Sequence, residues 1–169
     1  MKKTKLTLER LKKVYLYDPG TGLFLRLEET PSHGGKAKVG SPAGANDGGR
    51  YVRIGLDGQI YRAHRLAWFY MTGEWPKDGV DHIDLDGTNN RWSNLRAATQ
   101  SQNAANTRKR RDNTSGFKGV SRTASGTWQA CIWVKKRKIC LGTFPTPQEA
   151  FSAYQIAAEE HFGKYHRKS

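Results

Sequence analysis

The stretch VDHIDLDGTNNRWSNL, residues Val80 to Leu95, decides how this sequence is best understood. The 169-residue chain has 29 Lys and Arg against 15 Asp and Glu, a formal net charge of +14. Yet four aspartates lie within the nine residues from Asp78 to Asp86, around one histidine, His82. A basic protein attracts polyanions, and clustered aspartates would repel them unless a cation lies between. The stretch therefore predicts a site where aspartate and a polyanion share a cation.

The length suits one ordinary domain or two small ones. The hydrophobic fraction of 36% is low for one large core, so two compact cores are expected. Residues 108–169 carry a net charge of +9, whereas residues 78–106 carry −2. A pI of about 10 indicates a polyanionic partner, and nucleic acid is the first candidate.

Several other classes of protein are excluded by composition. We find no long apolar run and no strongly basic amphipathic helix, so neither a membrane span nor a membrane-surface helix is expected. The two cysteines, Cys131 and Cys140, form no CxxC pair, which argues against a zinc knuckle and against a disulfide-built secreted fold. The start of the chain lacks the apolar stretch of a signal peptide. A cytoplasmic location, in a bacterial or phage-infected cell, is expected.

Periodicity and turn residues predict the elements up to residue 106. Asp57-Gly58 is a favoured hairpin turn, and Thr99 with Gln102 makes a capping box. The expected elements are a helix over 6–14, a strand over 23–27, a loop over 31–49, a hairpin over 50–64, a helix over 64–73 and a short helix after Thr99.

The last segment has its own pattern. Three strand-like runs over 117–144 predict an antiparallel sheet. A helix follows, capped by Thr146 and ended by Gly163. In the middle strand, Trp128, Ala130 and Ile132 alternate with Gln129, Cys131 and Trp133; the first set is expected to face the helix.

The aspartate-rich stretch has the parts that phosphodiester hydrolysis needs. A general base must activate water, and a divalent cation can relieve charge on the phosphate. Mg²⁺ prefers a few oxygen ligands and retains several waters. The stretch offers Asp81 as a metal ligand and His82 as a base, and asparagines stand at 89, 90, 94, 103 and 106. The alternative is that Asp and Asn here only form turns through their own backbone.

The segment YRAHRLAWFYMTG…VDHIDLDGTNNRWSNLRAATQSQNAAN resembles HNH homing endonucleases of the phage and intron type, over about residues 50–106. That resemblance implies an α+β protein with a ββα-metal nuclease module. It implies His82 as the general base, Asp81 and Asn103 as ligands of Mg²⁺ or Mn²⁺, and Asn94 as the residue that holds the loop and orients the base.

Residues 114–167 resemble the ERF-type DNA-binding domain of plant transcription factors, on the motifs SGFKGV, LGTF and EAFSAY. That resemblance implies a three-stranded antiparallel sheet packed on one helix, with the outer face of the sheet in the DNA major groove. Ser121, Trp133 and Cys140 depart from the plant pattern, so the plant target sequence does not transfer. The expected DNA contacts are Lys118, Arg122, Gln129, Trp133 and Lys138. Trp133 has an alternative role as a covered hydrophobic side chain.

Two further features leave alternatives open. The run from Arg108 to Arg111 (Arg108, Lys109, Arg110, Arg111) is either a solvated tether or a set of phosphate contacts. His64 either touches a phosphate or packs at the start of its helix.

Together these features predict a nuclease module over 1–107, a basic linker over 108–113 and a DNA-binding domain over 114–169. The expected function is a site-specific, metal-dependent DNA endonuclease that acts as a monomer on double-stranded DNA, without a small-molecule substrate. The alternative is a non-catalytic, sequence-specific DNA-binding regulator with the same fold; an RNA-binding role ranks third. A chain ending near Arg111 is expected to keep metal-dependent nicking but to lose affinity and site preference.

Overall fold

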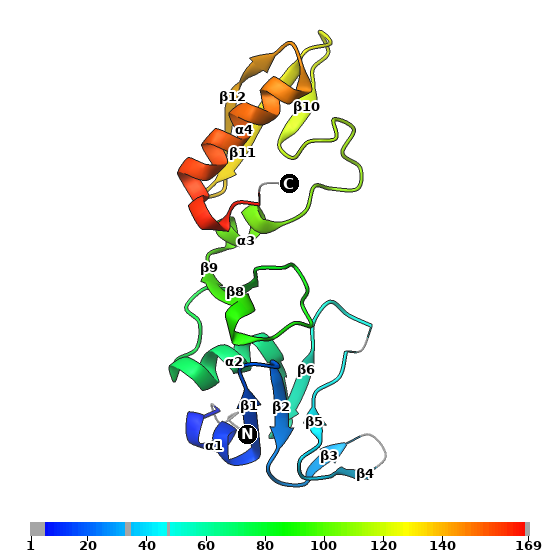
Figure 1. Cartoon of the computed structure of the whole chain (residues 1–169), viewed down its shortest axis with the longest axis vertical. Helices are drawn as coiled ribbons and strands as arrows, with labels where there is room; N and C mark the ends of the chain where they lie inside the picture. The colour runs from blue at the N-terminus through cyan, green and yellow to red at the C-terminus, as the bar shows by residue number, and fades with distance from the viewer. Residues whose placement is uncertain (1–5, 33–34, 47, 168–169) are drawn as a thin grey trace. The chain divides into compact units, whose positions relative to one another are not determined.

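The computed structural model describes residues 6–32, 35–46 and 48–167 (Figure 1). It divides into two compact units, Met1–Ala97 and Ala98–Ser169. The division precedes the predicted basic linker at 108–113, because the helix after Thr99 packs with the C-terminal unit. The outer ends of the two predicted domains, 1–5 and 168–169, lie outside the described residues. Within the described part, no helix is both long and apolar enough to cross a membrane.

The N-terminal unit begins with helix α1 (Leu8–Val14) and a three-stranded sheet in the order β1-β2-β5. Its strands are β1 (Tyr15–Asp18), β2 (Leu23–Arg26) and β5 (Pro42–Ala43), and a separate hairpin pairs β3 (Thr30–Ser32) with β4 (Gly35–Ala37). The expected loop over 31–49 therefore contains short strands. These strands have only two or three residues each, which is too short for a visible alternation of apolar and polar side chains.

The predicted hairpin and the helix after it are confirmed. Strands β6 (Arg53–Leu56) and β7 (Gln59–Arg62) pair antiparallel, and both turn residues, Asp57 and Gly58, have positive φ angles of 49° and 70°. Helix α2 (Ala63–Thr72) follows directly. Its buried face joins β1, β2 and β6 in the core of this unit, whose largest buried side chains are Tyr15, Phe24, Leu11, Ile54 and Leu66.

The aspartate-rich stretch lies between two short paired strands. Strand β8 (Gly79–His82) ends at the histidine, and strand β9 (Leu95–Ala98) is its partner. The connection between them includes a 3-10 turn, η1 (Trp92–Asn94). His82 thus stands at the point where the strand gives way to the loop.

The C-terminal unit contains helix α3 (Gln100–Asn106), a three-stranded antiparallel sheet and the long helix α4 (Pro147–Phe162), which continues into η2 (Gly163–Tyr165). The sheet strands are β10 (Val120–Arg122), β11 (Trp128–Val134) and β12 (Arg137–Phe144). Helix α4 packs along the sheet (Figure 1). The capping box of α3 and the Thr146 cap of α4 are both present.

The middle strand has the predicted alternation with one irregularity. Ala130 and Ile132 are buried in the core with Tyr154 of α4, and Trp133 is 63% exposed. The register shifts between Ala130 and Cys131. Cys131 is buried and lies opposite Cys140, with 3.0 Å between the two sulfur atoms.

Candidate active site

Aspartate and asparagine side chains build the loop between β8 and β9 from within. Asp84 accepts a hydrogen bond at 2.8 Å from the backbone N–H of Asp86 and another at 2.7 Å from the Asn89 amide. Asp86 accepts at 2.9 Å from the backbone N–H of Thr88. Partial burial raises the pKa of Asp84, but the donors on its carboxylate outweigh this and hold that pKa below its ordinary value. Asp84 and Asp86 are therefore turn-forming residues.

Asn94 holds this loop together. Its amide nitrogen donates to the Asp84 carboxylate at 2.9 Å and to the Asn89 carbonyl at 2.8 Å. Its amide oxygen accepts from the backbone N–H of Asp84 at 3.1 Å, and its backbone carbonyl accepts from Ile83 at 3.0 Å. Through these contacts Asn94 links Asp84, Asn89 and Ile83 within the loop. Its side-chain hydrogen bonds end on Asp84 and Asn89, and another asparagine contacts His82.

That asparagine is Asn90. The Nε2 atom of His82 lies 3.1 Å from Oδ1 of Asn90. The amide nitrogen of Asn90 donates to the Thr88 carbonyl at 3.1 Å, which directs Oδ1 toward the ring. Because Oδ1 can only accept, Nε2 carries the proton of the neutral ring. The lone pair is then on Nδ1, and the geometry selects this nitrogen as the one that can accept a proton.

Two rings flank the His82 side chain. Tyr51 stacks with it at a centroid distance of 5.9 Å and an interplanar angle of 29°. His64, the second residue of α2, meets it edge-on at 4.9 Å and 79°. Burial lowers the pKa of His82, against the opposing effects of Asn90 and the nearby aspartates. A histidine with a lowered pKa is neutral at physiological pH, as a general base must be.

His64 itself is buried, with only 4% of its surface exposed. Burial, followed by the neighbouring His82, lowers the pKa of His64 to about 3. Its Nδ1 atom has no hydrogen-bond partner within the described structure. This position agrees with the packing role and places a neutral ring against His82.

Asp81 is held by an arginine from the neighbouring strand. Both Nε and Nη2 of Arg96 donate to Oδ2 of Asp81, at 3.0 and 2.8 Å. The side chain of Asp81 is 3% exposed and that of Arg96 is 13% exposed. A buried carboxylate needs such a partner, because an unpaired buried charge is costly. Arg96 was not among the residues expected to act at the site; its one visible mark in the sequence is that it and Arg91 are the two basic residues of the stretch 78–106.

The predicted metal ligands are an aspartate and an asparagine, whose oxygen atoms suit Mg²⁺ or Mn²⁺. Asp81 lies in the N-terminal unit, and Asn103 is exposed on α3 of the C-terminal unit. Among residues 6–32, 35–46 and 48–167, no three His, Cys, Asp or Glu side chains converge as a metal site.

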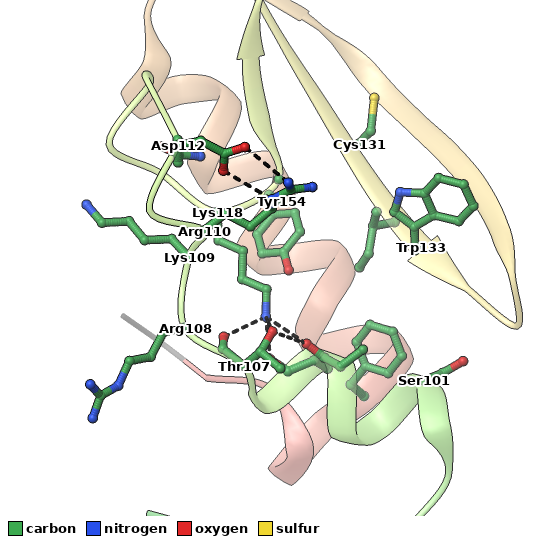
Figure 2. A pocket seen from close by; sticks show the side chains of 16 residues that line it. Ser101, Thr107, Arg108, Lys109, Arg110, Asp112, Lys118, Cys131, Trp133 and Tyr154 are labelled. Carbon is green, nitrogen blue, oxygen red and sulfur yellow. Dashed lines mark hydrogen bonds and ion pairs between the residues drawn. The ribbon is translucent and has the colours of Figure 1, made fainter. Parts of the chain in front are cut away.

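The predicted DNA contacts of the C-terminal unit are mostly on its surface. Arg108 to Arg111 are exposed, as are Arg122, Trp133 and Lys138, and Gln129 is partly exposed. The guanidinium of Arg122 lies 5.9 Å from the ring centroid of Trp128. Arg110 pairs with Asp112 at 3.1 Å, between two exposed side chains. A cavity of about 460 Å³ lies beside the basic run, with Trp133, Tyr154 and Lys118 also in its lining (Figure 2).

Lys118 is placed differently from the other predicted contacts. It precedes β10 and is partly buried, so it does not occupy an outward position on a strand. Its ammonium group donates to backbone carbonyls at the end of α3 (Figure 2). Lys118 lies outside the strand because Gly119, with φ of +76°, forms a turn before β10 begins.

The candidate site lies in a segment that is similar to known proteins. Residues 61–105 match the HNH endonuclease family, and this segment includes Asp81, His82, Asn94 and Asn103. The chain is 34% identical over 104 residues to an uncharacterised HNH endonuclease, L560, of Acanthamoeba polyphaga mimivirus, which covers 60% of this chain and 54% of that protein. This segment of the chain is thus similar to HNH endonucleases, and a longer stretch is similar to a viral protein.

Two other relatives match about half of the chain. Protein 3.8 of Escherichia phage T7 is 35% identical over 89 residues, which are 50% of this chain and 64% of that protein. The ethylene-responsive transcription factor ERF117 of Arabidopsis thaliana is 41% identical over 88 residues, 50% of this chain but 25% of that protein. The chain therefore spans less than two thirds of each of these curated relatives. No solved structure matches the chain.

Proposed function

We propose that this protein is a site-specific DNA endonuclease of the homing type, with His82 as its general base. The observation that carries the proposal is the state of His82 in a segment of the HNH endonuclease family. Asn90 holds the protonated Nε2 at 3.1 Å, and burial lowers the pKa of the ring. These features leave a neutral imidazole with its lone pair on Nδ1.

In this proposal, Nδ1 of His82 takes a proton from the water that attacks phosphorus. A P–O bond forms to that water, and the bond from phosphorus to the leaving oxygen breaks. The proton transfer makes His82 an imidazolium ion. The charges of Asp84, Asp81 and Asp86 favour this cation, and the hydrogen bond to Asn90 persists because Nε2 donates in both ring states.

Asp81 and Asn103 are the residues that we propose to hold one Mg²⁺ or Mn²⁺ ion. When bound, that ion supplies charge relief on the phosphate and on the leaving oxygen. Arg96 directs the Asp81 carboxylate through two N–H bonds to a single oxygen, Oδ2. The aspartates of this basic protein thus have two proposed roles, as a metal ligand and as turn-forming residues of the loop.

Double-stranded DNA is the proposed partner, with the C-terminal unit as its reader. A net charge of +9 over residues 108–169 favours a polyanion. The similarity to a plant transcription factor supports the same conclusion. The exposed run from Arg108 to Arg111 is proposed to contact phosphates, and Arg122, Gln129, Trp133 and Lys138 are proposed to contact bases or sugars from the sheet.

One observation favours a second candidate, a DNA-binding regulator that does not cleave. The carboxylate proposed to bind metal already pairs with Arg96 at 2.8 Å. A protein that retained the fold without the chemistry could keep this ion pair for stability alone. The two candidates differ in a single outcome, the cleavage of DNA.

The test is to incubate the full chain with phage and bacterial genomic DNA and Mg²⁺, and to map new ends by sequencing. We expect recurrent ends at a few sites, lost in EDTA and in Asp81→Ala. Binding measured by mobility shift should survive in EDTA. Ends that persist in EDTA would overturn the metal assignment, and binding without new ends would favour the regulator.

A further inference from the structure

We propose that Lys118 is a positioning residue, which fastens the C-terminal end of α3 to the C-terminal unit and thereby fixes Asn103. The inference rests on the proposed function, because Asn103 matters as a proposed metal ligand. It replaces the DNA contact that the sequence predicted for Lys118. All the contacts that carry it lie within the C-terminal unit.

Helix α3 needs an external partner at its C-terminal end. It has only seven residues, a length at which an isolated helix is marginal. Thr99 and Gln102 cap its first turn on both sides, so its start is well held. At its end, Thr107 bonds the Ala104 carbonyl through its backbone N–H and its hydroxyl, at 3.2 and 2.7 Å. The last carbonyls of a helix otherwise lack partners.

Lys118 supplies those partners. Its Nζ atom lies 3.0 Å from the Ala104 carbonyl oxygen, 2.8 Å from that of Ala105 and 2.9 Å from that of Thr107. Figure 2 shows the ammonium group among these contacts. An ammonium group has three N–H donors, so the three carbonyls account for all of them. A positive charge at a helix C-terminus also interacts favourably with the helix dipole.

This lysine has no carboxylate partner within the described residues. The partners that the described structure gives to its partly buried charge are thus the carbonyls of Ala104, Ala105 and Thr107 and the Thr107 hydroxyl oxygen. A basic side chain that reaches for DNA phosphate is instead expected to be exposed to solvent, as Arg108 is. The carbonyl partners of Lys118 thus favour a role in fastening α3 over a role in binding phosphate.

The backbone that carries Lys118 is fixed to the sheet and to α4. Gly119 has φ of +76°, and a Cβ atom there would come within 2.2 Å of the Tyr154 ring. The Gly119 carbonyl accepts from the backbone N–H of Cys131 at 2.8 Å. On the other side, Ser115 bonds the carbonyls of Phe117 and Val120 at 3.0 and 2.8 Å. Lys118 therefore extends from a rigid point to the end of α3.

The remaining attachment of α3 lies in its last turn. Ala105 is in the hydrophobic core of this unit, Asn106 is buried as well, and the helix packs on α4 and η2. Asn103 lies one, two and four residues before the three residues whose carbonyls Lys118 contacts. Its position is therefore expected to depend on the Lys118 contacts.

The experiment compares Lys118→Met with Lys109→Met in the full chain. Methionine keeps an unbranched side chain, one heavy atom shorter than lysine, and removes its charge. Lys109 is the matched control, because its ammonium is exposed and donates to one carbonyl, that of Gly116, at 2.9 Å. Hydrogen exchange of α3 amides, DNA affinity across a salt series and cleavage at saturating DNA are measured for each.

For Lys118→Met we expect α3 amides to exchange at least about tenfold faster, because charge-assisted bonds to its end are lost. Exchange in β11, β12 and α4 should stay unchanged, and so should the salt slope of binding. Cleavage at saturating DNA should fall about 10- to 100-fold, because a misplaced ligand lowers the chemical rate. For Lys109→Met we expect the reverse: unchanged α3 exchange and a salt slope reduced by about 0.9.

Unchanged α3 exchange in Lys118→Met, or a weaker affinity with a smaller salt slope, would overturn the proposal and favour a DNA contact. Should Lys118→Met not fold, Lys118→Arg decides the matter, because a guanidinium retains both charge and N–H donors. Protected α3 amides in Lys118→Arg support the fastening role, and their loss overturns it. Should the parent protein not cleave DNA, the proposed function fails, while the exchange data still decide the role of Lys118.

Discussion

At the scale of single residues, two asparagines of one loop have separate roles. Asn90 holds the His82 ring, whereas Asn94 makes its hydrogen bonds to Asp84, Asn89 and Ile83. Holding the loop and orienting His82 are therefore two separate roles, and substitutions of the two asparagines can distinguish them. The structure favours Asn90 as the orienting residue.

The two asparagines are distinguished by alanine substitutions. Asn90→Ala removes the acceptor that fixes the His82 tautomer, so we expect cleavage at saturating DNA to fall about tenfold or more. Asn94→Ala removes three side-chain hydrogen bonds and should lower the free energy of unfolding by about 2–4 kcal/mol. Single-turnover cleavage and denaturant unfolding measure the two effects. Cleavage by Asn90→Ala at the parent rate would return the orienting role to Asn94.

His64 makes stability depend on pH. Burial lowers its pKa from 6.5 to about 3 in the folded chain. Between these values the unfolded chain binds a proton that the folded chain does not, so stability is lost as pH falls below 6.5. We expect His64 to account for a loss of about 2 kcal/mol between pH 7 and pH 5. Urea unfolding at both pH values measures this, and His64→Phe should show a smaller loss. An equal loss in His64→Phe would contradict the assignment.

At the scale of elements, the aspartate-rich loop packs tightly on the segment before β6. A Cβ atom at Gly87 would come within 2.1 Å of the Arg50 carbonyl oxygen and within 2.7 Å of the Tyr51 ring. Tyr51 in turn stacks on His82. The loop, this segment and the candidate base are thus packed together.

Gly87→Ala should therefore disturb both the fold and the candidate site. We expect a loss of about 1–3 kcal/mol in the free energy of unfolding, because the backbone must move to relieve the overlap. Gly20→Ala is the matched control, because a Cβ there meets only a carboxylate oxygen of Asp18, at 3.4 Å. Thermal unfolding compares the two variants. Equal stability of both would show that the loop adjusts without cost.

Local chemistry explains which elements the sequence could predict. The Asp57-Gly58 turn, the Thr99 capping box and the Thr146 cap depend on residues a few positions apart, and all three are present. The contacts around the candidate site join distant positions instead. Asp81 and Arg96 are 15 residues apart, and no short pattern marks such a pair. Lys118 likewise meets carbonyls 11 to 14 residues earlier in the chain.

At the scale of the whole molecule, the division into units changes one expectation from the sequence. Helix α3 belongs to the C-terminal unit, where Ala105 is in the core and Lys118 holds its end. A chain ending at Arg111 would lose both attachments. The expectation that such a chain keeps nicking DNA is therefore reversed.

We now expect the chain ending at Arg111 to lose cleavage by about 100-fold or more, even at saturating DNA. The control is the full chain with Arg108, Lys109, Arg110 and Arg111 replaced by glutamine. This variant should bind more weakly, with a smaller salt slope, but retain cleavage at saturation. Rates measured at several protein concentrations separate the two effects. Full cleavage by the truncated chain at high concentration would show that α3 functions without the C-terminal unit.

The central claim is that His82 is the base of a DNA-cleaving site. Its most direct test is single-turnover cleavage of a mapped site by the parent and by His82→Ala, at pH 7.5 with Mg²⁺ and with protein in excess. A positioned base contributes about 10²- to 10⁴-fold, so the variant should be slower by that factor while its DNA affinity stays within about threefold of the parent. A variant that cleaves within about tenfold of the parent rate would contradict the account.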